Sequence, residues 1–147
     1  MTMQMNGVSE SEVAALLESR AEAIRRKDIE ALMGCYAGEA VAFDAWGPLR
    51  VNAATMRDHW QQCFDGHEGP LRFEHRELAI RAGDGVAFAH CLIGLSGKLV
   101  DGPEHRFWGR GSLGLVKVEG AWRIVHEHAS APFDPYTGKV SELTPDD

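Results

Sequence analysis

The hydrophobic pattern of this chain changes its period once, near Leu71. Before that point apolar residues recur every three or four positions, as they do along one face of a helix. After it come four extended segments, at about 71–81, 86–95, 105–118 and 121–131, separated by short breaks suited to chain reversal. Short connections between consecutive strands predict an antiparallel meander, and so apolar a sheet needs helices on one face. The fold class is therefore α+β.

Two helices are expected to open the chain. Ser9 and Glu12 have the spacing of a capping box, and the apolar periodicity behind them predicts a first helix over about 11–26. Asp28 can cap a second, shorter helix, and Gly38 offers the left-handed residue that would end it.

A short strand is expected at 41–44, and a third helix after it. Asn52 can cap this helix, which is expected to end near Gly66. The expected domain organisation is an extended or disordered N-terminus at 1–8, one domain at 9–133 and an extended tail at 134–147.

The composition narrows the classes of partner. A chain of 147 residues with 44% hydrophobic side chains can bury a core without disulfides or a structural metal. A net charge of −7 with scattered Lys and Arg argues against a nucleic-acid partner. Three widely spaced cysteines in apolar stretches are typical of buried free thiols in a reducing cytoplasm. With no apolar run of membrane-spanning length and no leader pattern, we expect a cytoplasmic protein without a membrane partner.

Three stretches carry a family resemblance. The run YAGEAVAFDAWG at 36–47 resembles the segment after the second helix of ketosteroid isomerases and SnoaL-like polyketide cyclases. The stretch RVN at 50–52 is similar to one before the third helix of that group, and GAWRIVHEHAS at 120–130 resembles the ending of small SnoaL-like proteins. The ending also resembles the association domain of calcium/calmodulin-dependent kinases. These stretches identify the chain as similar to the nuclear transport factor 2-like superfamily.

The resemblance implies a cone-shaped roll in which three N-terminal helices and a curved sheet enclose one pocket. It implies no cofactor, and a hydrophobic small molecule as ligand. It does not fix the chemistry, because this fold hosts isomerases, dehydratases, epoxide hydrolases, cyclases and binding modules.

Asp44 is the first candidate for chemistry, since it matches the position that resembles the general base of ketosteroid isomerases. Partial burial beside apolar neighbours would raise the pKa of its carboxyl and make it a better base near neutral pH. The alternative is an Asp that only caps the following turn. Arg20 stands where the isomerases carry the tyrosine of their oxyanion hole, so steroid isomerisation is not expected.

The last hairpin decides which residues face the pocket. A three-residue loop with a left-handed Gly120 would pair Leu113 with Val125, whereas a two-residue turn would change the pairing. In the first register Glu127 faces the side of Leu113, while a second set faces the opposite side. That second set comprises Trp108, Arg110, Ser112, Trp122, Ile124, His126 and His128.

By analogy with the kinase association domain, His90 also faces inward and meets Asp44 and Glu127 as an acid/base set. The alternative makes Glu127 a solvent-facing strand residue and His90 a core histidine. The expected ligand-binding residues are Trp46, Met56, His59, Trp60, Phe64, Arg110 and His128. For Arg110, contact with an anionic ligand competes with a simple role in strand solubility.

His126 and His128 lie two residues apart, as a metal-chelating pair on one strand would. No third ligand stands at a diagnostic spacing, so no metal is expected. The competing interpretation places this pair with Trp108 and Trp122 on an apolar sheet face that a homodimer buries.

Two functions follow from these residues. The first is a cofactor-independent lyase, isomerase or cyclase in which Asp44 acts as the base and His90 or Glu127 as its acid partner. The second is a dimeric binding or association module in which the same groups only satisfy a ligand. A phosphate-binding loop, a Cys-x-x-Cys pair and a nucleophile elbow are all missing from the sequence.

Overall fold

The computed structural model describes residues 7–147, and within them three helices pack on a six-stranded sheet. In chain order the elements are α1 (Gly7–Arg26), α2 (Ile29–Met33), β1 (Tyr36–Phe43), β2 (Val51–Asn52), α3 (Ala53–Asp65), β3 (His67–Ala82), β4 (Val86–Leu99), β5 (Glu104–Val118) and β6 (Ala121–Ser130).

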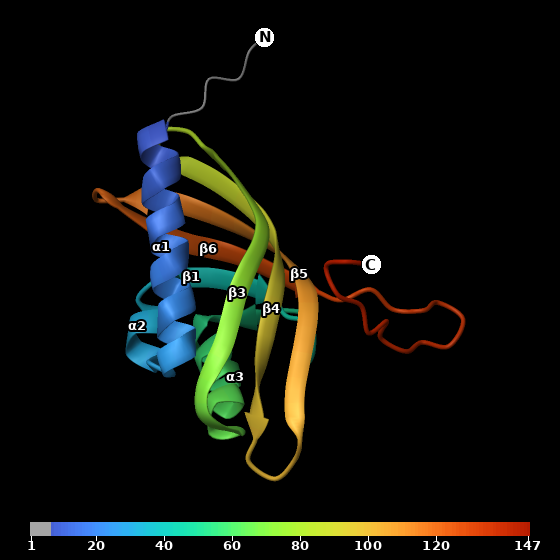
Figure 1. Ribbon diagram of the computed structural model, residues 1–147. Helices are drawn as coiled ribbons and strands as arrows, with labels where there is room; N and C mark the ends of the chain where they lie inside the picture. The colour runs from blue at the N-terminus through green and yellow to red at the C-terminus, as the bar shows by residue number, and fades with distance from the viewer. Residues whose placement is uncertain (1–6) are drawn as a thin grey trace.

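The sheet has the strand order β2-β1-β6-β5-β4-β3. Strands β3 to β6 form the antiparallel meander that the short connections predict, and β1 adds to β6 in parallel. The sheet is strongly curved and open, with α1 and α3 on its inner side, while the C-terminal tail loops out beyond β6 and its end turns back toward the sheet (Figure 1). The expected α+β class and cone-like architecture are confirmed.

Two of the three expected helix caps are present. The side chain of Asp28 accepts a hydrogen bond from the Ala31 amide (3.0 Å), and that of Asn52 accepts one from Thr55 (2.9 Å). The prediction of a capping box at Ser9 is wrong, because α1 already begins at Gly7 and Ser9 lies buried inside this helix. Residues 1–6 of the expected extended N-terminus lie outside the described residues.

The second helix is much shorter than expected. It ends at Met33 with Gly34 as its cap, and Gly38 lies inside β1 rather than ending a helix. The early end follows from the sheet: Tyr36 pairs with Ile124 of β6, and the Cys35 carbonyl accepts a hydrogen bond from the Ile124 amide (2.9 Å). Strand pairing therefore overrides the helical pattern of this segment.

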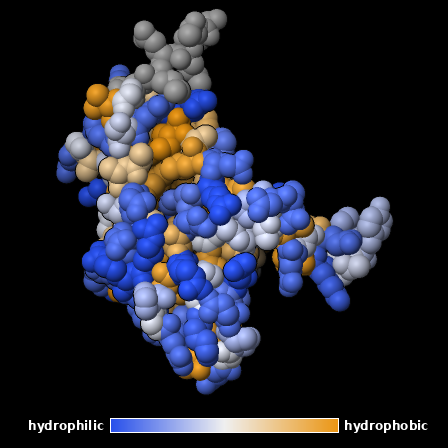
Figure 2. Space-filling view, viewed as in Figure 1, coloured by the Kyte–Doolittle hydropathy of each residue, from blue (hydrophilic) through white to orange (hydrophobic). Residues whose placement is uncertain are grey.

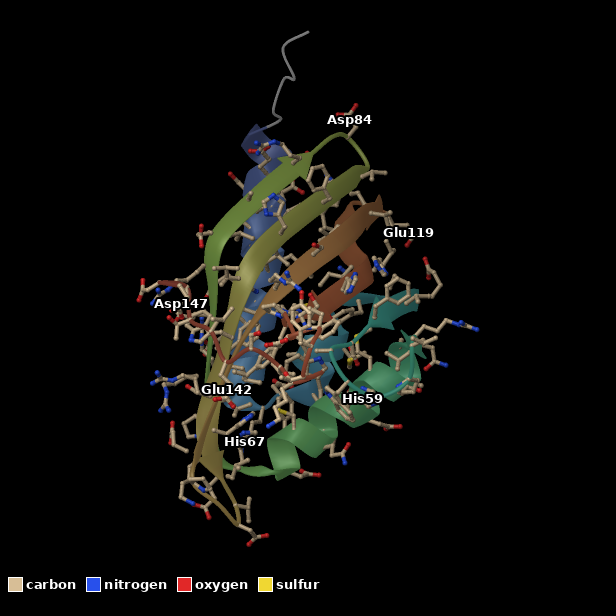
Figure 3. All side chains as sticks on the ribbon, turned by 90° about the vertical axis from the view of Figure 1, so that its right-hand side faces the viewer. His59, His67, Asp84, Glu119, Glu142 and Asp147 are labelled. Atoms are coloured by element: carbon tan, nitrogen blue, oxygen red, sulfur yellow. The ribbon has the colours of Figure 1, made fainter. Side chains whose placement is uncertain are left out.

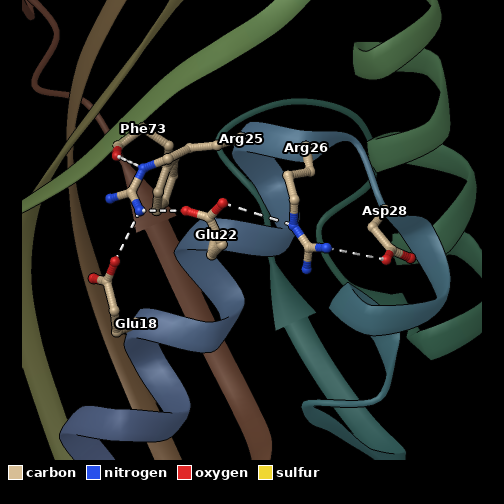
Figure 4. A network of polar contacts seen from close by, with 6 residues as sticks. All are labelled: Glu18, Glu22, Arg25, Arg26, Asp28 and Phe73. Atoms are coloured by element: carbon tan, nitrogen blue, oxygen red, sulfur yellow. Dashed lines mark hydrogen bonds and ion pairs between the residues drawn. The ribbon is translucent and has the colours of Figure 1, made fainter.

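The end of α1 is tied to the edge of the sheet. Arg25 donates from Nε to the carbonyl of Phe73 in β3 (2.9 Å) and pairs through Nη1 with Glu18 (2.8 Å) and Glu22 (3.2 Å). Arg26 extends this network from the other side of Glu22 (Figure 4). These exposed ion pairs add little stability by themselves, but they hold the last turn of α1 against β3.

The hairpin between β5 and β6 differs from the expected three-residue loop. Val118 pairs directly with Ala121, so the turn contains only Glu119 (φ 49°) and Gly120 (φ 80°). Two consecutive left-handed residues are the signature of a type I′ turn, whose twist matches that of the strands. A register shift then follows at Val125, which has no partner in β5.

Because of the two-residue turn and the register shift, some residues of β6 face the opposite side of the sheet from the one expected. Trp122 and Ile124 are buried on the inner side, against the expectation that they lie outside, whereas Glu127 faces inward as expected. A dimer interface containing Trp122 is therefore ruled out by its burial in the core of its own chain.

The surface is polar over most of the side that carries α1, with apolar residues gathered below the N-terminal end of that helix (Figure 2). The tail forms one small bridge, between Phe133 and Val140. Among the helices of residues 7–147, none combines the length and the apolar character needed to span a membrane.

Candidate functional site

Asp44 and His59 form a close pair at the end of β1. Asp44 follows β1 directly, and His59 lies on α3, where Figure 3 labels it. The Oδ2 atom of Asp44 lies 2.8 Å from Nδ1 of His59, and the two side chains are only 16% and 15% exposed. Because a carboxylate accepts hydrogen bonds, a neutral His59 donates from Nδ1 and keeps the lone pair on Nε2.

The loop after Asp44 covers the imidazole. The indole of Trp46 stacks on His59, with ring centroids 4.1 Å apart and an interplanar angle of 26°. Gly47 adopts a left-handed conformation (φ 84°), and a Cβ atom there would sit 3.4 Å from His59 Cε1. The glycine thus lets the backbone turn closely over the ring. Asp44, Trp46 and His59, all expected at the site, lie together.

A second polar cluster lies deeper, on the inner face of the sheet. Arg20 of α1 forms a buried ion pair with Glu127 of β6 and donates from Nε to the hydroxyl of Tyr36 in β1 (2.8 Å). The same hydroxyl lies 3.1 Å from each carboxylate oxygen of Glu127. Three elements are joined by this triad.

Burial and charge act against each other in this triad. Burial disfavours the charged guanidinium of Arg20, but attraction by Glu127 and Tyr36 outweighs it and raises the pKa of Arg20. Burial also raises the pKa of Tyr36, so its hydroxyl stays protonated. The Arg20 guanidinium faces aromatic rings, with its Cζ 5.9 Å from the Trp60 centroid and 5.5 Å from that of Phe73.

Two further titratable groups face Arg20. His75 on β3 packs edge-on against Phe73, and burial together with the charge of Arg20 lowers its pKa to about 4. Its Nε2 is buried and has no hydrogen-bond partner in residues 7–147. On β4, burial raises the pKa of the Cys91 thiol to about 11. The interior therefore holds a neutral imidazole and a protonated thiol beside a charged guanidinium.

Several expected site residues lie elsewhere. His90 is exposed on the outer face of the sheet, in one cross-strand row with Ser112 and His128, so it does not meet Asp44 or Glu127. The physical reason is strand alternation, because the buried neighbours Ala89 and Cys91 occupy the inner face. Arg110 is also exposed on the outer face, away from the Asp44–His59 pair.

The remaining expected ligand-binding residues belong to the interior. Met56 and Phe64 are fully packed in the core, and Trp60 lies between Phe64 and the Arg20 guanidinium. Of this set, Trp60 alone combines partial burial with a contact to the triad.

The His126 and His128 pair packs against Phe43. Both imidazoles meet the Phe43 ring edge-on, and His126 Nδ1 is hydrogen-bonded to the carbonyl of Val41 (2.7 Å). No group of three or more His, Cys, Asp or Glu side chains suited to a metal ion occurs in the described part of the chain.

Sequence reasoning missed the role of Arg20 and Tyr36, although one signal was available. Arg20 falls on the apolar stripe of α1, three residues after Leu17 and one before Ala21, both of which are buried completely. A charge on a buried stripe requires a partner in the interior, which here is Glu127. No comparable signal marks His75.

The chain matches known proteins by sequence and by fold. A family model described as SnoaL-like domain matches residues 13–134. A nuclear transport factor 2-like protein of unknown function from Pseudomonas putida is 33% identical with a TM-score of 0.86, covering 97% of this chain and 100% of that chain. Among curated proteins there is no significant match.

Two more distant structures share the fold alone. A putative scytalone dehydratase from Novosphingobium aromaticivorans is 11% identical with a TM-score of 0.79, covering 95% of this chain and 90% of that chain. A putative dehydratase of the nuclear transport factor 2-like family from Streptomyces avermitilis is 14% identical with a TM-score of 0.74, covering 86% of this chain and 98% of that chain. The family model spans most of the sequence, and the P. putida protein exceeds 30% identity over nearly the whole chain. The chain therefore belongs to the SnoaL-like domain family.

Proposed function

We propose that this protein is a cofactor-independent enzyme of the lyase, isomerase or cyclase type that transfers a proton on a hydrophobic small molecule. The observation that carries the proposal is the 2.8 Å contact between Asp44 and His59 under the Trp46 ring. An imidazole oriented by a carboxylate and sheltered from bulk water is a suitable general base.

The proposed chemistry needs only these two side chains. His59 accepts a proton from substrate carbon or hydroxyl at Nε2, and the Asp44 carboxylate stabilises the imidazolium that forms. The proton then returns from His59 to another atom of the substrate, or to a departing hydroxyl group. Trp46, which is 56% exposed, stacks on the imidazole and forms an apolar cover over the reacting centre.

The names of two relatives agree with this reaction class. The distant structures from N. aromaticivorans and S. avermitilis are both described as putative dehydratases, and the elimination of water is a reaction that a general acid and base can catalyse. In this proposal Glu127 takes no part in the proton transfer, because its carboxylate is already occupied by Arg20 and Tyr36.

The test measures proton transfer directly. A panel of aryl and cyclic ketones and β-hydroxy ketones is incubated with the protein in D₂O, and ¹H NMR follows C–H exchange and product formation. General base catalysis contributes about 10²–10⁴-fold, so Asp44→Asn and His59→Gln are each expected to lose at least about tenfold. Asp58→Asn, on the exposed side of α3, is the matched control and should keep full activity.

The same experiment separates catalysis from mere binding. A ligand that binds tightly, survives incubation unchanged and is held equally well by Asp44→Asn would show that the site belongs to a binding module. An exchange rate that falls less than about tenfold in both variants would also overturn the acid/base assignment.

We also propose that the outer sheet face joins two copies of the chain near the start of β4. Phe88 is 53% exposed there, and Val86 is exposed beside it on the same face. In the tail, Phe133 and Tyr136 are exposed as well, the latter to 96%. Light scattering should give a dimer mass, and Phe88→Glu should yield monomers. A monomeric wild-type protein at about 100 μM would refute this interface.

A further inference from the structure

A hollow on the outer face of the sheet carries a second set of polar residues. It lies on β3, β4 and β5, whereas Asp44 follows β1 near the other edge of the sheet. Arg72 of β3, Ser96 of β4 and Arg106 of β5 lie opposite one another in one cross-strand row. In the next row Gly94 lies between Glu74 and Trp108. The middle strand thus contributes its smallest side chains where its neighbours contribute long ones.

Gly94 determines how the Trp108 ring lies. A Cβ atom at Gly94 would be 2.6 Å from the indole, a distance that real contacts do not reach, so the ring must lie across the bare backbone of β4. The guanidinium carbon of Arg76 lies 5.3 Å from the indole centroid. The hollow therefore has an aromatic floor with a cation above it.

The hollow is a cavity of about 600 Å³, within the size range of small-molecule sites. Its wall includes four arginines, Arg25, Arg72, Arg76 and Arg106, and two acids, Glu74 and Asp146. That is a surplus of two positive charges on a chain whose net charge is −7. A locally positive cavity on an acidic protein attracts anions.

The arginines differ in what they already bind. Arg72 pairs with Glu104 and donates to the Ser96 hydroxyl (2.9 Å), and Arg76 lies 3.7 Å from Glu74. By contrast, the side chain of Arg106 forms no hydrogen bond or ion pair within residues 7–147, although its backbone pairs with Ser96. Its planar guanidinium can accept a carboxylate in the two-pronged geometry that arginine favours.

We propose that this cavity binds a small planar organic carboxylate. The carboxylate pairs with Arg106 and Arg76, and the flat part of the ligand stacks on the Trp108 indole, which lies flat over Gly94. This site lies on the opposite face of the sheet from the Asp44–His59 pair and does not depend on the function proposed for that pair.

The C-terminal tail covers one side of the site. Thr144, Pro145 and Asp146 line the cavity, and Figure 3 shows the end of the tail, labelled Asp147, beside β3 and β4. The Asp147 carboxylate is occupied by the Thr144 amide (2.8 Å), whereas Asp146 brings a negative charge to the cavity wall. Asp146 therefore competes with an anionic ligand for the arginines.

The test uses benzoate as the probe and the full chain in calorimetric titrations. Arg106→Gln and Arg76→Gln are each expected to weaken benzoate binding about fivefold or more. Gly94→Val, which forces the indole off β4, is expected to weaken it about tenfold. Arg81→Gln, an exposed arginine of β3 outside the cavity wall, is the matched control and should bind as the wild type does.

Further titrations test whether the ligand's negative charge is what the cavity recognises. Asp146→Asn should tighten benzoate binding about two- to fivefold, since it removes a competing charge. Neutral benzamide should bind much more weakly than benzoate, and His59→Gln should leave benzoate binding unchanged.

The inference fails on any of four results. No benzoate binding by the wild type up to about 10 mM would remove the site. Equal affinity for benzamide, or tighter binding of inorganic phosphate, would show that a planar carboxylate is not the ligand. Wild-type affinity in both arginine variants would show that benzoate binds elsewhere, and this readout does not require Gly94→Val to fold.

Discussion

Removing the carboxylate of Glu127 leaves the guanidinium of Arg20 charged and unpaired in the interior, where the Arg20 side chain is only 3% exposed. Breaking one side of a buried ion pair costs about 3–5 kcal/mol of unfolding free energy. We therefore expect Glu127→Leu to be among the most destabilising single changes in this chain. In a domain of this size, each kcal/mol lowers the melting temperature by about 2–4 °C, so the midpoint should fall by roughly 10 °C.

The same geometry predicts a rescue. Replacing both partners, in Arg20→Met/Glu127→Leu, removes the stranded charge and fills the space with apolar atoms. Such replacements are often neutral or stabilising, but here the buried Tyr36 hydroxyl loses both its partners. The double variant should therefore recover to within about 1–3 kcal/mol of the wild type. Tyr36→Phe keeps the ion pair but loses hydrogen bonds to charged groups, which cost about 1.5–3 kcal/mol.

Urea unfolding followed by circular dichroism gives the free energies for the complete cycle of single and double variants. Glu104→Leu, which breaks the exposed pair with Arg72, is the control and should cost less than about 1 kcal/mol. A loss below about 1 kcal/mol in Glu127→Leu would refute the reasoning. So would strictly additive single losses in the double variant, because a coupled pair cannot be additive.

Two further changes test the interior and a helix end. The pKa of His75 falls from its ordinary 6.5 to about 4 in the folded chain, so the unfolded chain takes up the proton first as the pH drops. The contribution of His75 to the unfolding free energy is therefore fully present above about pH 6.5 and is lost as the pH falls towards 4. The loss amounts to roughly 1–2 kcal/mol after allowance for solvent screening. His75→Phe should reduce the slope of the unfolding free energy against pH in this window. The control His90→Phe, at an exposed position, should leave that slope unchanged. Equal slopes in the two variants would contradict the assignment to His75. Asn52→Ala should lower the unfolding free energy by about 1 kcal/mol in urea titrations through loss of the α3 cap, and an unchanged midpoint would show that the cap contributes nothing.

The sequence predicted the features that depend on local chemistry. The caps at Asp28 and Asn52 and the four-stranded meander after Leu71 follow from side-chain capping, turn residues and short connections, and all are present. Asp44 lies beside the third helix, where its carboxylate contacts His59, but the spacing of residues did not identify His59 as its partner.

The features that depend on distant partners were not predictable in the same way. Tyr36 continues the apolar spacing of the second helix, but its pairing with Ile124 draws it into β1. The outward position of His90 depends on the alternation of β4, and the family analogy gave the wrong face. In both cases the deciding neighbour lies outside the local segment, where a pattern of spacings carries no information about it.

Glu127 nevertheless faces the expected side, because two deviations from the expected hairpin cancel. Residues directly opposite one another in an antiparallel pair share a face, so the partner of inward-facing Leu113 also faces inward. The two-residue turn alone would make that partner His126. The extra residue at Val125 shifts the register by one and makes it Glu127. If Val125 instead paired with Gly114, as it would in a ladder without the bulge, His126 would turn inward against Arg20 and the carboxylate that the guanidinium needs would face outward. This bulge is therefore as necessary to the buried triad as the three side chains themselves.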